Sequence, residues 1–460
     1  MDDRFVLRLQ EMLDTAFCGP EVTSGTLARL EEFLRPYAES LTEPAQRTHT
    51  REYVQGLFSK LERKTGEAIA YLHDQERQGL QKFIGHAPWE HQPLLTTLAK
   101  EVGEQIGEAD GVIVFDPSAF AKKGKKSVGV ARQWCGRLGK VDNCQVGVFM
   151  GYVSRQEHAL VDVRLYLPKE WTGDRTRCAE AGVPVGTRFR TRHELALEML
   201  DEQGPLLPHA WVTGDDEMGR PAEFRRDLRV RGERYLLAVP SNTLVRDLET
   251  EPPVYAGRGR PPERPFMQVR RWCAALPTTA WTRLDVRDGE KGPLVTEAVR
   301  CRVTARLGQC AGPEEWLFVT RELQSDGCFK HDYYLGHTGA TDLGAPELME
   351  LARVAKAEHR VEECIQRAKS EAGLGDYQVR NWVGWHHHLT LSLVAAWFLV
   401  GETRRGKNPH PRSDRATPSQ PDREPVGRAS ELQPADERSS PHHPLADAER
   451  TGTLLSLPRA

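Results

Sequence analysis

Two short apolar runs, each followed directly by an aspartate, place the strongest constraint on how this chain can fold. The first reads GVIVF at residues 111–115 and is followed by Asp116, and the second reads HAWVTG at residues 209–214 and is followed by Asp215. Short apolar runs bounded by turn signals are typical of buried strands. A sheet that contains both strands would therefore present two carboxylates where its strands end.

The elements around these runs predict the fold class. Strand-like runs cover residues 144–153 and 158–167. A helical stretch, RHELALEML, precedes Asp215, and a short helix around AEFRRDL and a strand, RYLLAVP, follow it. The order of three strands, helix, strand, helix and strand predicts an α/β fold in which helices flank a mixed sheet.

Changes of pattern divide the chain into three predicted regions. Residues 1–105 read as an N-terminal helical region, and residues 106–400 form the main domain. Within that domain, about 241–312 is first irregular and then strand-like, which predicts a mainly β insertion before a long helix over 346–372. Residues 401–460 are rich in Pro, Arg, Ser, Asp and His, so they are expected to form a disordered tail.

Composition excludes several classes of protein. The net charge of -3 does not indicate a nucleic-acid binder, so any such contact would need local basic patches. No run of eighteen apolar residues is present, which argues against a membrane span. The acidic start lacks the layout of a signal peptide. Nine cysteines without a CxxC pair predict reduced thiols rather than zinc, so a cytoplasmic protein is expected.

Carboxylates at strand ends are suited to phosphoryl transfer by metal ions. Mg²⁺ prefers hard oxygen ligands and keeps several waters. Two such ions, about 3.5–4 Å apart, can activate the attacking oxygen and stabilise the leaving oxygen. A lone aspartate after a strand is most often a turn residue, so Asp116 and Asp215 do not settle the chemistry by their placement.

Three ordered blocks of the chain resemble the DDE transposases of bacterial insertion sequences. FDPSAFAKKGKKSVGVARQWCGRLGKVDNCQVGVF is similar to the first block of that family, and WVTGDDEMG with RYLLAVP is similar to the second. HRVEECIQRAKSEAGLGDYQVRNWVGWHHHLTLSLVAAWFL is similar to the third. With the helical lead-in FSKLERKTGEAIAYL, the resemblance covers about residues 50–400. It implies a ribonuclease-H-like core that uses two Mg²⁺ ions, for which Mn²⁺ can substitute.

The resemblance also assigns roles to individual residues. Asp116 and Asp215 would be the first two catalytic, metal-binding carboxylates. In the third block, the family places a glutamate seven residues before a lysine on one helix, and Glu362 and Lys369 satisfy that spacing. Seven residues span nearly two helical turns, so both side chains project from one face. Glu362 would complete the metal site, and Lys369 would contact the DNA backbone.

Neighbouring acidic residues leave alternatives for two of these assignments. Asp216 adjoins Asp215, and Glu363 adjoins Glu362. In each pair, the residue that matches the family register is chosen. Glu358 lies one turn before Glu362 and could share its face of the helix.

The chain departs from the family pattern at several positions. Pro117 stands where relatives often carry a second aspartate, which leaves one carboxylate fewer near Asp116. The arginine and tyrosine that often precede the glutamate in the family are not cleanly present, because Ala355 and Glu358 fall there. Arg360 is expected to compensate as a DNA contact.

Basic residues follow the first aspartate directly. The run consists of Lys122, Lys123, Lys125 and Lys126. Such a run is normally a solvated loop, but beside a metal site it is well placed to neutralise DNA phosphates, and we favour that interpretation. The N-terminal helical region could also bind DNA, or it could brace the main domain, because it contains no clear helix-turn-helix pattern.

Aromatic and histidine residues give weaker signals. Trp272, Trp281 and Trp316 lie in or near the predicted insertion, where an aromatic residue of related transposases can stack on an extruded base. The sequence does not choose among them. The consecutive residues His386, His387 and His388 would spread around a helix axis rather than converge on a metal.

The resemblance predicts a cut-and-paste DNA transposase. Its partners would be the transposon ends and target DNA, and it would act as a homo-oligomer, expected to be a dimer, at the nucleoid. Two alternatives remain at this point. One is a catalytically silent, domesticated DNA-binding descendant, and the other is a nuclease of the same fold that does not rejoin strands.

Overall fold

The computed structural model describes residues 25–62, 64–255, 257–258, 262–289, 292–339 and 347–407. Within these residues, no helix combines the length and the apolar character needed to cross a membrane. Residues 1–24 of the predicted helical region and most of the predicted tail lie outside them.

A mixed sheet forms the centre of the molecule. Its first half consists of β1 (Val112–Ala121), β2 (Ala131–Cys135), β3 (Lys140–Val153), β4 (His158–Leu165), β5 (Trp211–Gly214) and β6 (Tyr235–Ala238). Strand β1 lies between β3 and β5, antiparallel to β3 and parallel to β5, and β5 is parallel to β6. Strands β2 and β4 both pair with β3. The predicted mixed sheet is therefore confirmed.

The β-rich segment continues the same sheet beyond β6. It contains β7 (Leu244–Asp247), β8 (Met267–Gln268), β9 (Thr282–Gly289), β10 (Gly292–Leu307), β11 (Cys310–Leu323) and β12 (Phe329–His337), with helix α13 (Val269–Ala274) between β8 and β9. Strand β12 joins it to the first half by antiparallel pairing with β6. Strand β11 extends well past residue 312, so the predicted end of the insertion falls inside a strand.

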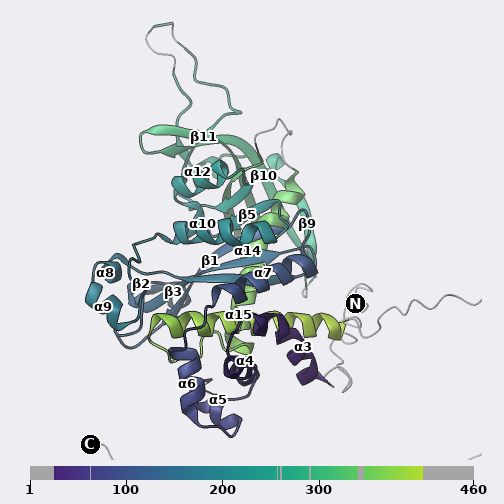
Figure 1. Cartoon of the computed structure of the whole chain (residues 1–460). Coiled ribbons are helices and arrows are strands. Elements are labelled where there is room, and N and C mark those ends of the chain that lie inside the picture. Colours follow the sequence, from purple (N-terminus) through teal and green to yellow (C-terminus); the bar gives the residue numbers. More distant parts are fainter. Residues whose placement is uncertain are drawn as a thin grey trace, which may run out of the picture. The chain divides into compact units, whose positions relative to one another are not determined.

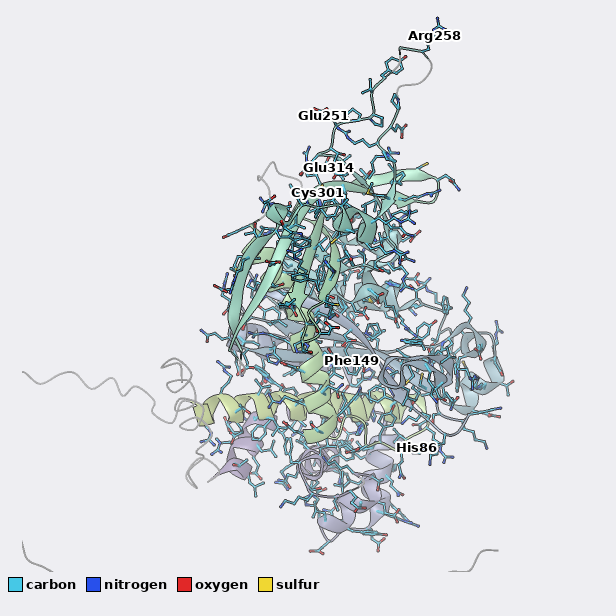
Figure 2. All side chains as sticks on the ribbon, turned by 180° about the vertical axis from the view of Figure 1, so that it is seen from behind. His86, Phe149, Glu251, Arg258, Cys301 and Glu314 are labelled. Carbon is cyan, nitrogen blue, oxygen red and sulfur yellow. The ribbon has the colours of Figure 1, made fainter. Side chains whose placement is uncertain are left out.

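Helices cover both faces of the sheet. They are α7 (Gln92–Ile106), α8 (Lys169–Thr172), α9 (Arg175–Glu180), α10 (Arg192–Gln203), α11 (Asp216–Gly219), α12 (Ala222–Val230), α14 (Leu348–Glu371) and α15 (Trp382–Lys407). Short 3₁₀ turns lie at Gly136–Leu138, Gly204–Leu206 and Thr278–Ala280. Helix α10 is in front of the sheet in Figure 1, whereas α14 is in front when the molecule is seen from behind in Figure 2. Helix α14 therefore crosses the face opposite α10 and packs against β1.

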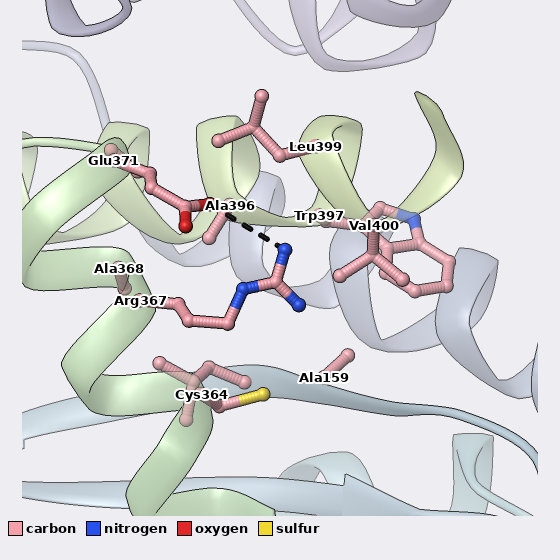
Figure 3. Close-up of a pocket in the computed structure, with 11 residues that line it drawn as sticks. Ala159, Cys364, Arg367, Ala368, Glu371, Ala396, Trp397, Leu399 and Val400 are labelled. Carbon is pink, nitrogen blue, oxygen red and sulfur yellow. Dashed lines mark hydrogen bonds and ion pairs between the residues drawn. The ribbon is translucent and has the colours of Figure 1, made fainter. Parts of the chain in front are cut away.

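Helices α14 and α15 pack closely against each other and against β4. The cavity between them measures about 20 Å³ and is bordered by Cys364, Trp397 and Leu399 (Figure 3). Arg367 and Glu371 form an ion pair of 3.5 Å at its edge. A space of this size holds about one water molecule, so this cavity has no room for a larger ligand.

Four N-terminal helices lie on the side of α15 that faces away from the sheet (Figure 1). They are α3 (Thr26–Glu39), α4 (Pro44–Leu57), α5 (Gly66–Leu72) and α6 (Arg77–Gly85). Their apolar side chains share one continuous core with the sheet and with α15. Glu402 of α15 pairs with Arg29 of α3 at 2.6 Å. This contact ties the end of α15 to α3, and α15 is helical to Lys407, although the sequence predicts a disordered tail from residue 401.

Two of the three consecutive histidines of α15, His387 and His388, fasten the N-terminal helices to α15. His388 Nδ1 lies 2.8 Å from the hydroxyl of Tyr53, and His386 Nδ1 lies 3.0 Å from the carbonyl of Trp382. Burial lowers the pKa of His388 to about 3. The rings face different partners, as expected for consecutive helical positions, and they do not converge on one point.

His387 makes the closest contacts of the three, so its replacement should weaken this junction. Its ring nitrogens lie 3.0 and 2.8 Å from the carbonyl oxygens of Ile84 and Trp89, and its ring stacks on Trp89 at 3.5 Å. We expect His387→Ala to lower the free energy of unfolding by about 2–4 kcal/mol, measured by urea denaturation, because contacts are lost and a cavity remains. His359→Ala, on an exposed part of α14, serves as control and should change stability little. Equal stability of the two variants would contradict this account of the junction.

Candidate active site

Strand pairing places the first two predicted carboxylates side by side. Strands β1 and β5 run parallel, and their paired residues end with Phe115 opposite Gly214. Asp116 and Asp215 are the next residues of the two strands, and neighbouring strands lie about 4.8 Å apart. The sequence predicts that Asp116 follows its strand, but β1 continues to Ala121. The reason is β3, whose long antiparallel pairing keeps β1 extended after the pairing with β5 has ended.

Both aspartates are partly buried, and burial is the main cause of their raised pKa values. The pKa of Asp116 is raised to about 6 by burial and by the charge of Glu362, although Lys369 acts in the opposite direction. The pKa of Asp215 is raised to about 7 by burial and by Asp116. Asp215 Oδ1 also accepts a hydrogen bond of 3.0 Å from the backbone N–H of Met218, which fixes the carboxylate at the start of α11. Buried carboxylates that repel each other are stabilised by a bound cation.

Helix α14 brings two further carboxylates to the aspartates. Glu358 is half-buried, and burial together with Asp215 and Asp116 raises its pKa to about 8. Glu362, one turn later, remains 62% exposed, and its charge raises the pKa of Asp116. We call Asp116, Asp215, Glu358 and Glu362 the carboxylate cluster.

The carboxylate cluster offers the type of donor atom that Mg²⁺ prefers. All of its donor atoms are hard carboxylate oxygens, and their mutual repulsion favours a cation. Among the residues that the structure describes, no three acidic, histidine or cysteine side chains already have the spacing of a metal site. The exposed side chain of Glu362 would have to rotate towards the aspartates to complete such a site.

The structure separates the adjacent acidic residues that the sequence leaves as alternatives. Asp216 lies in α11 and forms an ion pair of 3.2 Å with Arg220 at the surface. Glu363 lies 3.3 Å from Nε2 of His359, and Glu362 lies 3.5 Å from Nδ1 of the same ring, so this histidine does not separate them. Glu362 is the member of its pair whose charge raises the pKa of Asp116. Asp215 is the member of its pair whose pKa is raised by the charge of Asp116.

Glu217 is a residue near the site that the sequence analysis does not identify. Its charge raises the pKa of both Asp116 and Asp215, and its carboxylate pairs with Arg192 of α10. The run Asp215-Asp216-Glu217 is visible in the sequence. Only the turn into α11 shows that Asp215 and Glu217, the first and third residues of this run, lie close enough to Asp116 for their charges to interact with it.

Lys369 lies beside the carboxylate cluster, as its spacing from Glu362 predicts. Its Nζ is 2.9 Å from Oγ of Ser118, and its charge lowers the pKa of Asp116. Ser118 is two residues after Asp116 in β1, and such residues share one face of a strand. Arg360 is half-buried on α14, but residues two apart on a helix do not share a face, so it projects away from Glu362.

The lysine run after β1 contains two kinds of side chain. Lys122 is half-buried with its ammonium 3.5 Å from the centre of the Tyr377 ring, and burial lowers its pKa to about 8. Lys123, Lys125 and Lys126 are exposed. The three exposed lysines can reach an external phosphate, whereas Lys122 is held against the protein.

The three tryptophans differ in their accessibility. Trp272 is buried and donates a hydrogen bond of 2.7 Å to Asp247, so it belongs to the core of the β-rich segment. Trp281 is half-buried, with the guanidinium of Arg321 4.1 Å from its ring. Trp316 is half-buried on β11. Trp281 and Trp316 thus remain alternatives for a stacking role.

Comparisons with known proteins agree with this arrangement. The family described as DDE superfamily endonuclease matches residues 36–293, a range that includes both aspartates and ends before α14. A protein of Microchaete diplosiphon described as "Probable transposase for insertion sequence element IS701" is 26% identical over 231 residues. That match covers 49% of this chain and 57% of the relative, so the chain spans only somewhat more than half of the relative's length.

A cryo-EM structure of the piggyBac transposase synaptic complex with hairpin DNA matches at a TM-score of 0.37 and 11% identity, over 85% of this chain and 75% of that one. This likeness does not by itself establish a common fold. The family match is independent of it and covers more than half of the chain. The chain therefore belongs to the DDE superfamily endonuclease family.

Proposed function

We propose that this chain is a DNA transposase that cleaves transposon ends and joins them to target DNA with divalent metal ions. The observation that carries the proposal is the register of β1 and β5, which places Asp116 beside Asp215. Family membership and the transposase relative support DNA as the substrate. The protein would act in the cytoplasm, at the nucleoid.

Each residue of the site would have a defined task. Asp116, Asp215 and Glu362 would hold two Mg²⁺ ions, or Mn²⁺ in their place. When bound, the ions would activate water or a 3′-hydroxyl and stabilise the leaving oxygen. Lys369, fixed by Ser118, would hold the phosphate backbone next to the reacting bond.

Glu358 would act on this site through charge. It is half-buried beside both aspartates, so its proton uptake would limit the repulsion within the cluster. The exposed lysines after β1 would neutralise phosphates that flank the reacting bond. Arg360 would contact DNA farther from the reacting bond.

Two transposon ends have to be held together for cut-and-paste transposition, so we infer a homo-oligomer, most simply a dimer. The silent-descendant alternative is disfavoured because all three predicted carboxylates are present and two of them are adjacent. The nuclease alternative shares this site and differs only in the products.

Strand joining distinguishes a transposase from a nuclease. We expect the protein, given DNA that carries the ends of its own element, Mg²⁺ and a target plasmid, to release 3′-hydroxyl ends and covalently joined products. Sequencing of the junctions provides the measurement. Cleaved ends that never appear joined to the target would contradict transposase activity and favour the nuclease.

A further inference from the structure

A cleft separates the N-terminal helices from the segment that joins α14 to α15. Its volume is about 480 Å³, within the range that ligand sites occupy. His86, which lines it, is labelled beside the N-terminal helices in Figure 2. The residues that carry the following argument are Lys64, Gly85, Tyr377 and Arg380, all of which line the cleft.

Lys64 places a nearly buried positive charge at this cleft. The residue is only 6% exposed, and its ion pair with Asp376 is 4.0 Å long. That length exceeds the distance of a hydrogen bond. A buried ammonium is unfavourable unless it is paired closely, so an anion in the cleft would stabilise it.

The remaining charges at the cleft also favour an anion. Arg380 is exposed at its edge. The acidic residue that lines it, Glu67, is engaged by Arg77 at 2.9 Å and by the hydroxyl of Tyr71 at 3.2 Å. The carboxylate of Glu67 is therefore already neutralised by a neighbour, whereas Lys64 has only a long ion pair.

The cleft is joined to the strand that carries Asp116. Val128, just after the lysine run, donates a backbone hydrogen bond of 2.8 Å to the carbonyl of Arg380. Lys122 lies over the ring of Tyr377, which lines the cleft. Six residues of extended strand separate Asp116 from Lys122 and span about 20 Å, or roughly six steps of B-DNA. A DNA molecule bound at the carboxylate cluster is therefore long enough to extend to the cleft if it spans about six base pairs or more.

We propose that this cleft binds a backbone phosphate of the DNA that is held at the carboxylate cluster. Lys64 provides the buried charge, Arg380 the charge at the edge, and the open volume takes the attached sugar or base. The N-terminal helices then form one wall of a DNA site. The inference rests on the proposed function, because it takes DNA as the substrate.

The test compares a charge variant with a volume variant. Lys64→Gln removes the ammonium, and Gly85→Leu fills the cleft without changing charge, because a Cβ at Gly85 meets no atom within 4 Å. Lys100→Gln is the matched control, since Lys100 is 66% exposed on α7. Binding of a labelled DNA duplex by the full chain is measured by anisotropy over a series of salt concentrations with EDTA present, so that cleavage plays no part.

We expect Lys64→Gln and Gly85→Leu each to weaken binding about tenfold and to reduce the slope of log affinity against log salt by about one, as for one lost phosphate contact. Lys64→Arg should restore the slope, and Lys100→Gln should leave it unchanged. If Lys64→Gln does not fold, Gly85→Leu and Arg380→Gln carry the test.

Three results would overturn the inference. Slopes of log affinity against log salt that do not differ between the cleft variants and Lys100→Gln would show that the cleft makes no phosphate contact. This holds even if the wild-type protein binds and cleaves DNA. Protection of the Lys64 amine from chemical modification by inorganic phosphate, but not by DNA, would assign the cleft to a free anion. Absence of any DNA binding by the wild-type protein would overturn the proposed function and the cleft together.

Discussion

Replacing Asp116 with asparagine should remove Mg²⁺-dependent cleavage of DNA and, in the same protein, stabilise the metal-free fold. Activity should fall about 10³-fold or more, because asparagine cannot supply the charge that a metal ligand provides at this position. Stability should rise because the side chain is partly buried beside Glu362 and Asp215. A residue that lowers stability but is needed for activity is expected at an active site.

The stability effect has a defined dependence on pH. The pKa of Asp116 is raised to about 6, above its ordinary value of 3.8, by burial and the charge of Glu362. The folded protein thus holds a proton that the unfolded chain releases, and stability is lost as pH rises between these two values. Above pH 6, we expect Asp116→Asn to be about 1–3 kcal/mol more stable than the wild-type protein, and below pH 4 the gain should vanish.

Urea denaturation in EDTA at several pH values measures this effect. Asp216→Asn is the matched control, because Asp216 is at the surface and paired with Arg220. Its stability should not rise with pH relative to the wild-type protein. A stability gain of the same size for both variants would contradict the burial of Asp116 as its cause.

Replacing Glu362 with glutamine should give the second large effect. Cleavage should fall about 10³-fold, whereas DNA binding in EDTA should remain close to that of the wild-type protein. The charge of Glu362 acts on Asp116, and its side chain is exposed and held only by a 3.5 Å ion pair with His359, which it can leave to bind a metal. Glu363→Gln changes the next residue in the same way and should keep most of the activity, because Glu362 rather than Glu363 is the residue whose charge raises the pKa of Asp116.

Glu358→Gln decides between two positions on α14 for the third ligand. If Glu358 acts only through charge, its glutamine variant should retain measurable Mg²⁺-dependent cleavage with a changed pH profile. Full activity of Glu362→Gln, with loss of activity in Glu358→Gln, would move the third metal ligand one turn towards the start of the helix.

Local sequence was sufficient to predict the strands that carry the two aspartates. The apolar runs before Asp116 and Asp215 are strands β1 and β5, and the mixed sheet has the predicted class. The spacing of Glu362 and Lys369 predicted that both lie on one helix near Asp116, which the structure shows for Lys369 through its contact with Ser118. These features depend on short stretches of chain, which is why sequence patterns report them.

Other features depend on partners that are distant in the sequence. The extension of β1 past Asp116 requires pairing with β3, and the burial of Lys122 requires the ring of Tyr377 from the segment before α15. Glu358 looks like any charged residue of an amphipathic helix until α14 is placed across β1. No local pattern contains this information. The metal-binding and DNA-binding roles of the site residues remain predictions.

Mg²⁺-dependent cleavage of DNA by the wild-type protein and by Asp215→Asn tests the central claim most directly. Mg²⁺ is titrated into a reaction with DNA that carries the ends of the element, and the 3′-hydroxyl products are quantified. The wild-type protein should yield products that increase with Mg²⁺ and disappear with EDTA, and the variant should yield none. Cleavage that persists in EDTA, or equal cleavage by Asp215→Asn, would contradict the assignment of the carboxylate cluster as the metal site.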